Sequence, residues 1–326
     1  ADYAHFSDPY IASDGDTLQV DYYVLKESLE KAIPHFKQTN GVLSCFEQYF
    51  GKYPFWNDGL AFVETPYLGM EHQGAIAYGN KYMRGYLGKM IPRDMNWDFI
   101  IVHELGHEWF GNSVSSNDHA EMWIHESFTT YMEALFVECS FGYDAAIRYL
   151  ESQKLFIANK EPILGPLNVN FDGWTRSDHY YKGSRILHTL RHALNNDDLW
   201  FEILRGFYKK FEISHCTTQD FVDYVNEKTG RDWKGFFEQY LEYTGIPKLI
   251  YSLKETDNGL MIKYKWDADS GDFAMPILVG KSEKAVLINP NATGFQVNMI
   301  HKMTVSDFYV PVKQFYVKTK QLKWKD

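Results

Sequence analysis

Two histidines and a glutamate stand close together in the apolar stretch "FIIVHELGHEWFGN", which runs from position 99 to position 112. The polar groups of such side chains are costly to bury unless something pairs with them. On a helix, residues four apart lie on one face about one turn from each other, so His103 and His107 can reach the same ion. Glu104 projects to the side, where it can approach a water on that ion without ligating it. The spacing therefore predicts a catalytic zinc site rather than two satisfied histidines and a surface glutamate.

A catalytic zinc ion commonly takes three protein ligands and keeps one position for water. Eighteen residues separate His107 from Glu126, which leaves room for the end of one helix, a loop and a returning helix. Glu126 begins the amphipathic stretch "ESFTTYMEALF" and is a candidate for the third ligand. Glu121 and His125 lie close by, so the residue pattern alone leaves these two alternatives open.

The stretch "HELGHEWFGN", followed by Glu126 within "WIHESFTTY", resembles the zinc aminopeptidases of the aminopeptidase N type, which are gluzincin metallopeptidases. Their pattern is H-E-x-x-H, eighteen residues, and a glutamate in a W-x-x-E-G-F-A-x-Y setting, from which Ser127 and Thr129 depart mildly. The resemblance implies one zinc ion held by His103, His107 and Glu126, with Glu104 as the general base. Thermolysin-like endopeptidases share this layout but surround the third ligand differently, so the resemblance favours an aminopeptidase.

A second motif precedes the histidines, because "LGMEHQG" is similar to the G-x-M-E-N segment of this family. Gly69, Met70 and Glu71 match, whereas Leu68 and His72 replace the usual glycine and asparagine. The resemblance implies that Glu71 holds the free amine of the substrate. It also implies that the backbone at Gly69 and Met70 aligns the peptide along an edge strand.

A third motif follows Glu126, because Tyr180, Lys182 and Gly183 in "HYYKG" resemble the Y-x-K-G segment of the family. The resemblance implies that Tyr180 donates its hydroxyl to the developing oxyanion, with the adjacent Tyr181 as a rival. A phenol suits this role, because it is neutral at working pH and is a good hydrogen-bond donor.

These side chains need a helical framework, and most segments before position 247 have helical periodicity. Leu60–Thr65 and Gly74–Gly79 are the exceptions and are predicted to be buried strands. The expected helices are 25–32 (limited by Pro34), 41–50, 97–110, 126–139, 145–158, 181–194, 198–211, 218–228 and 233–244.

After Gly245-Ile246-Pro247 the pattern changes to a period of two residues. "KLIYSLKE" and "LMIKYKW" flank an Asn-Gly pair, which predicts a β-hairpin. The short strands "AMPILVG", "KAVLIN", "GFQVNM" and "DFYVPV" are expected to follow. We therefore predict an α+β protein with a thermolysin-like, mainly helical catalytic domain at 1–247, which includes a small β-subdomain. A small all-β sandwich is predicted at 248–326.

The composition excludes several classes of partner. The formal net charge is −10, and no basic run occurs before the short tail "KTKQLKWK", which argues against a nucleic-acid partner. No apolar run has the length of a membrane span. Cys45, Cys139 and Cys216 are few and far apart, which predicts neither a zinc knuckle nor a disulfide framework. We expect a soluble protein, with the periplasm or the cell exterior preferred to the cytoplasm.

The expected function is hydrolysis of N-terminal residues from peptides with a free N-terminus. An endopeptidase or an epoxide hydrolase of the same fold is the alternative enzyme, and a catalytically weak fragment acting as a binding module is the alternative of another class. Family members usually begin with a β domain of about two hundred residues. We expect this N-terminal domain to be missing here and to complete the site in the parent protein.

Overall fold

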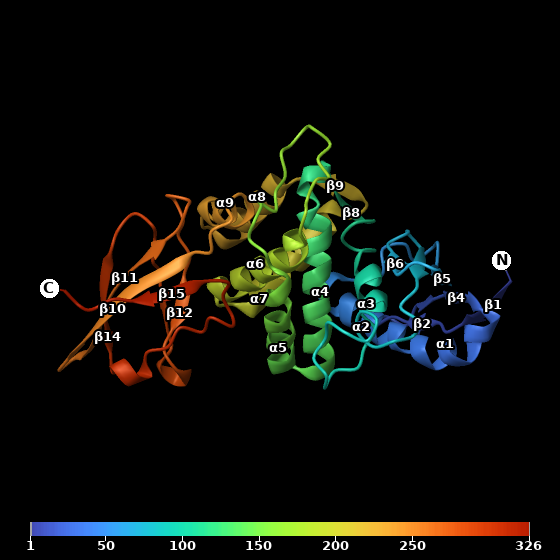
Figure 1. Ribbon diagram of the computed structural model, residues 1–326, viewed down its shortest axis with the longest axis horizontal. Coiled ribbons are helices and arrows are strands. Elements are labelled where there is room, and N and C mark those ends of the chain that lie inside the picture. The colour runs from blue at the N-terminus through green and yellow to red at the C-terminus, as the bar shows by residue number, and fades with distance from the viewer. Residues whose placement is uncertain (1, 326) are drawn as a thin grey trace.

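The computed structural model describes residues 2–325 and has a mixed α+β fold of elongated shape (Figure 1). A sheet near the N-terminus lies at one end, helices fill the middle, and the strands that follow position 247 lie at the other end. No helix within residues 2–325 combines the length and the apolar character that crossing a membrane requires.

The N-terminal sheet has the order β1-β4-β5-β7-β6, with β4, β5 and β7 parallel and the two edge strands antiparallel to their neighbours. Its strands are β1 (Tyr3–Ser7), β4 (Val20–Leu25), β5 (Leu60–Glu64), β6 (Gly69–Met70) and β7 (Ala75–Tyr78). The sequence predicted β5 and β7 but not β1 and β4. The alternation in β4 was a readable signal, because Val20, Tyr22 and Val24 all face the core.

Two helices follow in the chain, α1 (Leu29–Phe36), which packs on β4 of this sheet, and α2 (Gln38–Phe50), which leads into the helical core. The expectation that Pro34 limits the first helix was wrong, because α1 continues through it. A proline removes only one backbone donor. The ring of Phe36 packs at 4.6 Å from that of Tyr22, so burial against the sheet holds the last turn in place.

The middle of the molecule is built around a long buried helix, α4 (Trp123–Phe141). The other helices of this part are α3 (Phe99–Gly106), α5 (Tyr143–Gln153), α6 (Asp178–Leu194), α7 (Asp197–Phe211), α8 (Thr218–Thr229) and α9 (Lys234–Leu241). Cys45 of α2 and Cys139 of α4 form a disulfide across 94 positions, with Cα atoms 6.2 Å apart. The sequence did not predict this bond, because only the packing of the two helices brings the two thiols together.

The last part of the chain begins with the predicted hairpin of β10 (Lys248–Thr256) and β11 (Gly259–Asp267). β14 (Gln296–His301) extends the sheet next to β11, and β15 (Lys318–Gln321) runs parallel to β10 on its other side. The expected strand "DFYVPV" is not a strand, whereas β15 was not expected. Pro311 lacks the backbone N–H that a strand ladder needs, and a capping box at Thr304 starts a 3-10 turn just before.

Short strand pairs complete the fold. They are β2 (Tyr10–Ile11) with β3 (Thr17–Leu18), β8 (Val114–Ser116) with β9 (Ser214–Cys216), and β12 (Ile277–Val279) with β13 (Val286–Ile288).

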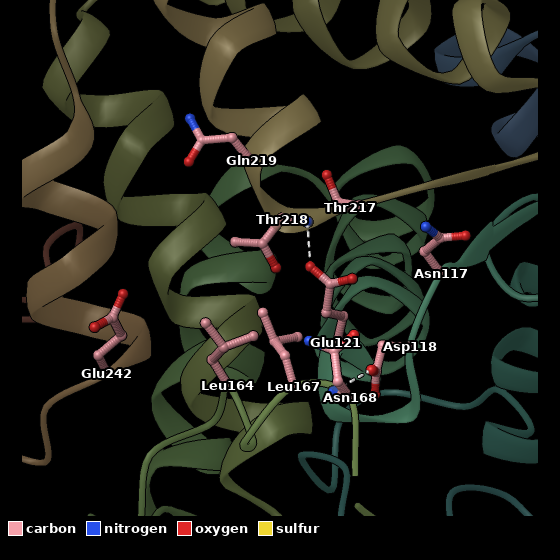
Figure 2. A pocket seen from close by; sticks show the side chains of 10 residues that line it. All are labelled: Asn117, Asp118, Glu121, Leu164, Leu167, Asn168, Thr217, Thr218, Gln219 and Glu242. Carbon is pink, nitrogen blue, oxygen red and sulfur yellow. Dashed lines mark hydrogen bonds between the residues drawn. The ribbon is translucent and has the colours of Figure 1, made fainter. Parts of the chain in front are cut away.

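A hollow of about 430 Å³ lies where the N-terminus of α8 meets the short 3-10 turn η2 (His119–Glu121) (Figure 2). Two of its carboxylates, those of Glu121 and Asp118, already accept from backbone donors. Glu121 Oε1 accepts from the N–H of Thr218 at 2.6 Å, and Asp118 accepts from the N–H groups of Ala120 and Asn168. This hollow therefore stabilises the loop that leads into α4 and does not contain the side chains that the motifs single out.

Candidate metal centre

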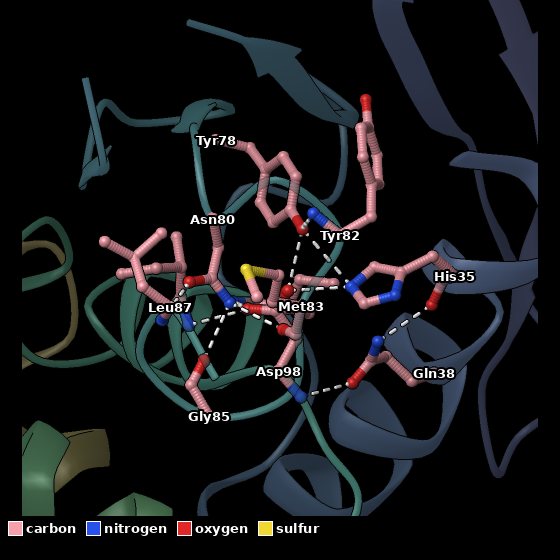
Figure 3. Close-up of polar contacts among 11 residues, drawn as sticks. His35, Gln38, Tyr78, Asn80, Tyr82, Met83, Gly85, Leu87 and Asp98 are labelled. Atoms are coloured by element: carbon pink, nitrogen blue, oxygen red, sulfur yellow. Dashed lines mark hydrogen bonds and ion pairs between the residues drawn. The ribbon is translucent and has the colours of Figure 1, made fainter. Parts of the chain in front are cut away.

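The start of α3 is fixed by Asp98, whose carboxylate is fully buried (Figure 3). Oδ1 of Asp98 caps the helix by accepting from the backbone N–H groups of Ile100 at 2.9 Å and Ile101 at 3.2 Å. Oδ2 accepts from the Tyr78 hydroxyl at 2.7 Å and lies 2.7 Å from Nε2 of His35. The helix that carries both histidines is thereby tied to β7 and to α1.

The side chains of His103, His107 and Glu126 converge from α3 and α4. The two Nε2 atoms lie 3.2 Å apart, and Oε2 of Glu126 lies 3.5 Å from that of His103 and 3.4 Å from that of His107. All three residues are buried. The structure thus brings together the residues that the sequence named as metal ligands.

The hydrogen bonds of the two imidazoles show what kind of ligand fits between them. Nδ1 of His103 lies 2.6 Å from Oε1 of Glu133, and Nδ1 of His107 lies 2.9 Å from the carbonyl of Phe110. Since both partners accept, both Nδ1 atoms carry a hydrogen, and both Nε2 atoms present lone pairs when the imidazoles are neutral. Apart from these imidazoles, no described residue offers a donor to Oε2 of Glu126. Three acceptors that face one another fit a bound cation.

The electrostatics agree with a positive charge at this point. Burial lowers the pKa of His103, but its hydrogen bonds to Glu126 and Glu133 outweigh burial and raise it well above its ordinary value. A proton or a metal ion among these groups would offset the negative charge of the buried carboxylates. Two imidazoles and one carboxylate form a donor set that zinc takes in catalytic sites.

Glu104 lies beside the cluster and is 6% exposed. Burial raises the pKa of its carboxyl, the two histidines lower it and the carboxylates of Glu71 and Glu126 raise it, with a net value of about 7. Carboxylate oxygens of Glu71 and Glu104 and a ring nitrogen of His107 all lie within 4.8 Å of one another. Glu71 therefore belongs to the same site, on the side of His107.

Gly69 explains how β6 comes so close to this site. A Cβ atom added at position 69 would lie 2.6 Å from Oε1 of Glu104 and 2.8 Å from Cγ2 of Ile100. Since ordinary carbon contacts are longer than this, only glycine lets the strand backbone pass over Glu104. Met70 follows on β6 and is exposed.

Tyr180 stands over the cluster from the first turn of α6, with its ring 6.0 Å from the ring of His103. Burial raises the pKa of its hydroxyl, and Glu126 raises it further, so the phenol stays neutral. Tyr181, the rival, packs its ring at 5.2 Å on that of Phe156 and also lines the pocket beside the cluster. Gly183 lets α6 lie against α4, because a Cβ there would be 1.6 Å from Oγ of Ser127.

The rival third ligands have other partners. Nε2 of His125 accepts from the backbone N–H of Ser116 at 2.8 Å, and Glu121 accepts from Thr218. Burial lowers the pKa of His125 to about 4, which keeps this imidazole neutral as an acceptor. Neither residue joins the groups that could hold an ion among the described residues.

Comparison with known protein families decides the identity of this fold. Residues 35–240, more than half of the chain, match the model described as the Peptidase family M1 domain. The chain belongs to peptidase family M1.

Among M1 relatives, aminopeptidase N of Lactococcus lactis subsp. lactis is 25% identical over 244 residues, which make up 69% of this chain and 28% of that protein. Aminopeptidase A of Legionella pneumophila, solved with aspartic acid, has a TM-score of 0.74 at 17% identity. The superposition covers 100% of this chain and 39% of the Legionella chain. A two-domain M1 zinc metallopeptidase bound to L-tryptophan has a TM-score of 0.60 at 21% identity, over 75% of this chain and 52% of its own. The chain spans less than a third of the Lactococcus protein, and the solved structures share its fold.

One residue of the candidate site escaped the sequence reasoning, namely Glu133 on α4. Its Oε1 faces His103, while Oε2 accepts hydrogen bonds from the hydroxyl of Tyr149 and the amide of Gln153. Glu133 is fully buried. The available signal was its position two helical turns after Glu126, in a helix with few other charges.

The M1 site opens into a pocket of about 340 Å³. The pocket is lined by Leu68, Gly69, Tyr86, Phe99, Ile100, His103, Glu104, Ser177, Tyr180 and Tyr181.

Proposed function

We propose that this chain is the catalytic part of a zinc aminopeptidase, which hydrolyses the first peptide bond of substrates with a free N-terminus. The observation that carries the proposal is the position of Glu71. Its carboxylate lies close to the carboxylate of Glu104 and to the ring of His107. His107 also belongs to the candidate metal-ligand group with His103 and Glu126. A carboxylate at that point pairs with an α-ammonium group and restricts cleavage to the end of a chain. Matches to aminopeptidase N and aminopeptidase B support the same reading.

We further propose the role of each side chain. A bound zinc ion would polarise the scissile carbonyl and lower the pKa of a water. Glu104, whose pKa burial raises to about 7, accepts a proton from that water and passes it to the leaving amine. The hydroxyl of Tyr180 donates to the carbonyl oxygen as its charge develops. Glu71 holds the α-ammonium, and the backbone of Gly69 and Met70 aligns the peptide.

The division of the chain is also a proposal. Residues 1–247 would form the thermolysin-like catalytic domain, and residues 248–326 a small β-sandwich domain. Support comes from the change to strands at β10 and from the family match, which ends at residue 240. Since the Lactococcus relative is much longer than this chain, we propose that a further domain completes the amine site in the intact protein.

The decisive experiment combines metal analysis with a panel of aminoacyl reporters, set beside the same peptides with an acetylated N-terminus. An aminopeptidase binds one zinc ion per chain and cleaves only the free-amine peptides. Equal cleavage of acetylated peptides would instead identify an endopeptidase. Zinc binding without any cleavage, in this chain and in the longest version of the protein, would leave only a binding module.

The variant Glu71→Gln tests the observation that carries the proposal. We expect it to lose at least about tenfold in kcat/KM on free-amine peptides, because the charge that pairs with the ammonium is gone. Zinc content should stay at the level of the unmodified protein. The exposed Glu202→Gln on α7 is the matched control and should change neither quantity.

A further inference from the structure

We propose that one face of the sheet β14-β11-β10-β15 is a docking surface for an anionic lipid bilayer, to which the protein binds peripherally and reversibly. The inference concerns a part of the chain that the proposed aminopeptidase function does not use. None of the described residues that carry it lines the pocket at the candidate metal centre. The sheet lies at the opposite end of the molecule from the N-terminal sheet (Figure 1).

Charge is divided unevenly along the chain. Residues 248–326 contain 12 lysines, no arginine and 8 acidic residues, which gives this part a formal charge of +4. Since the whole chain carries −10, residues 1–247 carry −14. The basic run "KTKQLKWK" begins at Lys318 and belongs to the positive part. Such an asymmetry between two parts of a chain is typical of proteins whose basic part binds an anionic surface.

The pleat of the sheet places lysines together on one face. Ile262, Tyr264 and Trp266 of β11 are buried in the core, so the residues that alternate with them point to the opposite face. The strand register brings further lysines of β10 and β15 to that same side. We call it the lysine face, and its lysines are Lys248, Lys254, Lys263, Lys265, Lys318 and Lys320. Within the described strands, Asp267 is the one carboxylate on this face, and it lies 3.1 Å from Lys248.

Exposed apolar side chains border these lysines. Val297 and Met299 of β14 are 51% and 37% exposed, and Val297 is the strand partner of Lys263. The ring of Phe295, just before β14, is 44% exposed. The ammonium groups of Lys263 and Lys265 lie 5.6 Å and 5.3 Å from the centre of that ring. A surface that combines cations with exposed apolar groups gains from both the headgroups and the acyl boundary of a bilayer.

The type of cation favours a bilayer over other anionic partners. The basic residues of the lysine face are lysines without arginine, and an ammonium group attracts phosphate as a point charge without a fixed geometry. Readout of nucleic-acid bases and pairing with protein carboxylates typically use the planar fork of arginine, and protein interfaces are depleted in lysine. An anionic bilayer needs only positive charge held near its surface.

The test measures sedimentation of the whole chain with vesicles of phosphatidylcholine and phosphatidylglycerol, beside vesicles of phosphatidylcholine alone. We expect binding to the anionic vesicles only. The affinity should fall by about tenfold or more when the salt concentration rises from about 0.05 M to about 0.5 M, because salt screens the attraction. A short DNA duplex at the same salt concentrations tests the other class of polyanion and should bind more weakly than the anionic vesicles.

Charge reversal at β15 tests the lysine face itself. Lys318→Glu combined with Lys320→Glu changes two positions of a strand whose residues are all exposed. We expect the affinity for anionic vesicles to fall by at least about 30-fold, because each lysine near the surface contributes about fivefold. The matched control is Lys31→Glu combined with Lys37→Glu, which makes the same change in net charge at exposed positions near the other end of the molecule. It should leave the affinity within about twofold.

A further variant tests the apolar contribution without changing the charge. Val297→Ser should weaken binding by about threefold to fivefold at both salt concentrations, because less apolar surface enters the bilayer. Each variant should keep the thermal unfolding midpoint of the unmodified protein, which separates a binding defect from a folding defect. The absence of binding to anionic vesicles at low salt, an equal loss in both lysine pairs, or tighter binding of the DNA duplex would overturn the proposal.

Discussion

Oε1 of Glu133 lies 2.6 Å from Nδ1 of His103, and this contact sets the orientation of the first histidine of the metal centre. The carboxylate of Glu133 accepts a hydrogen bond from the Nδ1–H of His103. The opposite ring nitrogen, Nε2, is thereby left free to bind an ion. Since α4 supplies both Glu126 and Glu133, a single helix provides one ligand and orients another.

We expect Glu133→Gln to weaken zinc binding by about 10-fold to 100-fold, because an amide holds the imidazole less firmly than a carboxylate does. Competition with a chelator of known affinity measures the change. Tyr149→Phe is the matched control, since it removes one hydrogen bond to the same carboxylate but keeps its charge. An equal loss in both variants would point to the packing around position 133 instead.

Glu104→Gln should retain one zinc ion and lose turnover by at least about a thousandfold, because glutamine cannot take the proton of the attacking water. Zinc content and kcat on an aminoacyl reporter are measured on the same preparation. Near-normal turnover in this variant would remove Glu104 from the mechanism.

Tyr180→Phe should lower kcat by about 100-fold to 1,000-fold with unchanged zinc content, because one donor to the developing oxyanion is lost. The substitution keeps the ring that packs on His103. Tyr240→Phe on α9 removes a buried hydroxyl that donates to the carbonyl of Tyr316 and serves as the control. A loss confined to KM would show that Tyr180 binds the ground state only.

Asp98→Ala should lower the free energy of unfolding by about 2–4 kcal/mol, because it removes the cap of α3 together with buried hydrogen bonds to a carboxylate. Urea denaturation of the protein with zinc removed measures the fold alone. Thr217→Ala removes the capping box of α8 at a partly exposed position and should cost about 1 kcal/mol. Equal losses in the two variants would mean that Tyr78 and His35 add nothing.

Lys182 gives a pH dependence whose sign can be worked out. Burial lowers the pKa of this ammonium from 10.5 to about 8. Between these values the unfolded chain binds a proton that the folded chain lacks, so stability rises with pH across this window. The stability of the unmodified protein relative to Lys182→Met should therefore rise by as much as about 3 kcal/mol from pH 8 to pH 10.5.

Urea denaturation of both proteins at several pH values in this window is the measurement. Lys209→Met, at an exposed position on α7, is the control and should give a difference that does not change with pH. A flat difference for Lys182→Met would mean that the buried amine keeps an ordinary pKa and stays charged across this window.

The sequence revealed those parts of the site that depend on spacing along one element. His103 and His107 are four residues apart, so this pair was readable from its spacing, whereas Glu126 was preferred to Glu121 and His125 through the resemblance to a known family. The contact of Glu133 with His103 and that of Asp98 with Tyr78 join different elements, so they depend on packing that the sequence pattern does not specify. The disulfide between Cys45 and Cys139 was also not predicted, because it depends on the packing of two distant helices.

The fold shows the same division between local and long-range information. Helices whose apolar residues recur with clear helical periodicity were predicted to within a few residues of their ends. The hairpin of β10 and β11 was predicted from its Asn-Gly turn. β15 was missed because its four residues are all exposed and carry no alternation. Tyr86, which shapes the pocket, lies between β7 and α3 in a segment without periodicity, so its position depends on the packed structure.

The close approach of α6 to α4 at Gly183 has a consequence for how this protein can change over generations. The helix that carries Tyr180 touches the helix that carries Glu126 through a point where one hydrogen atom fills the space of a side chain. A methyl group at position 183 would clash with Ser127 and push the two helices apart, although neither sequence motif would change. The candidate metal ligands and Tyr180 therefore depend on each other's helices, and the smallest residue type, glycine, sets the spacing between them.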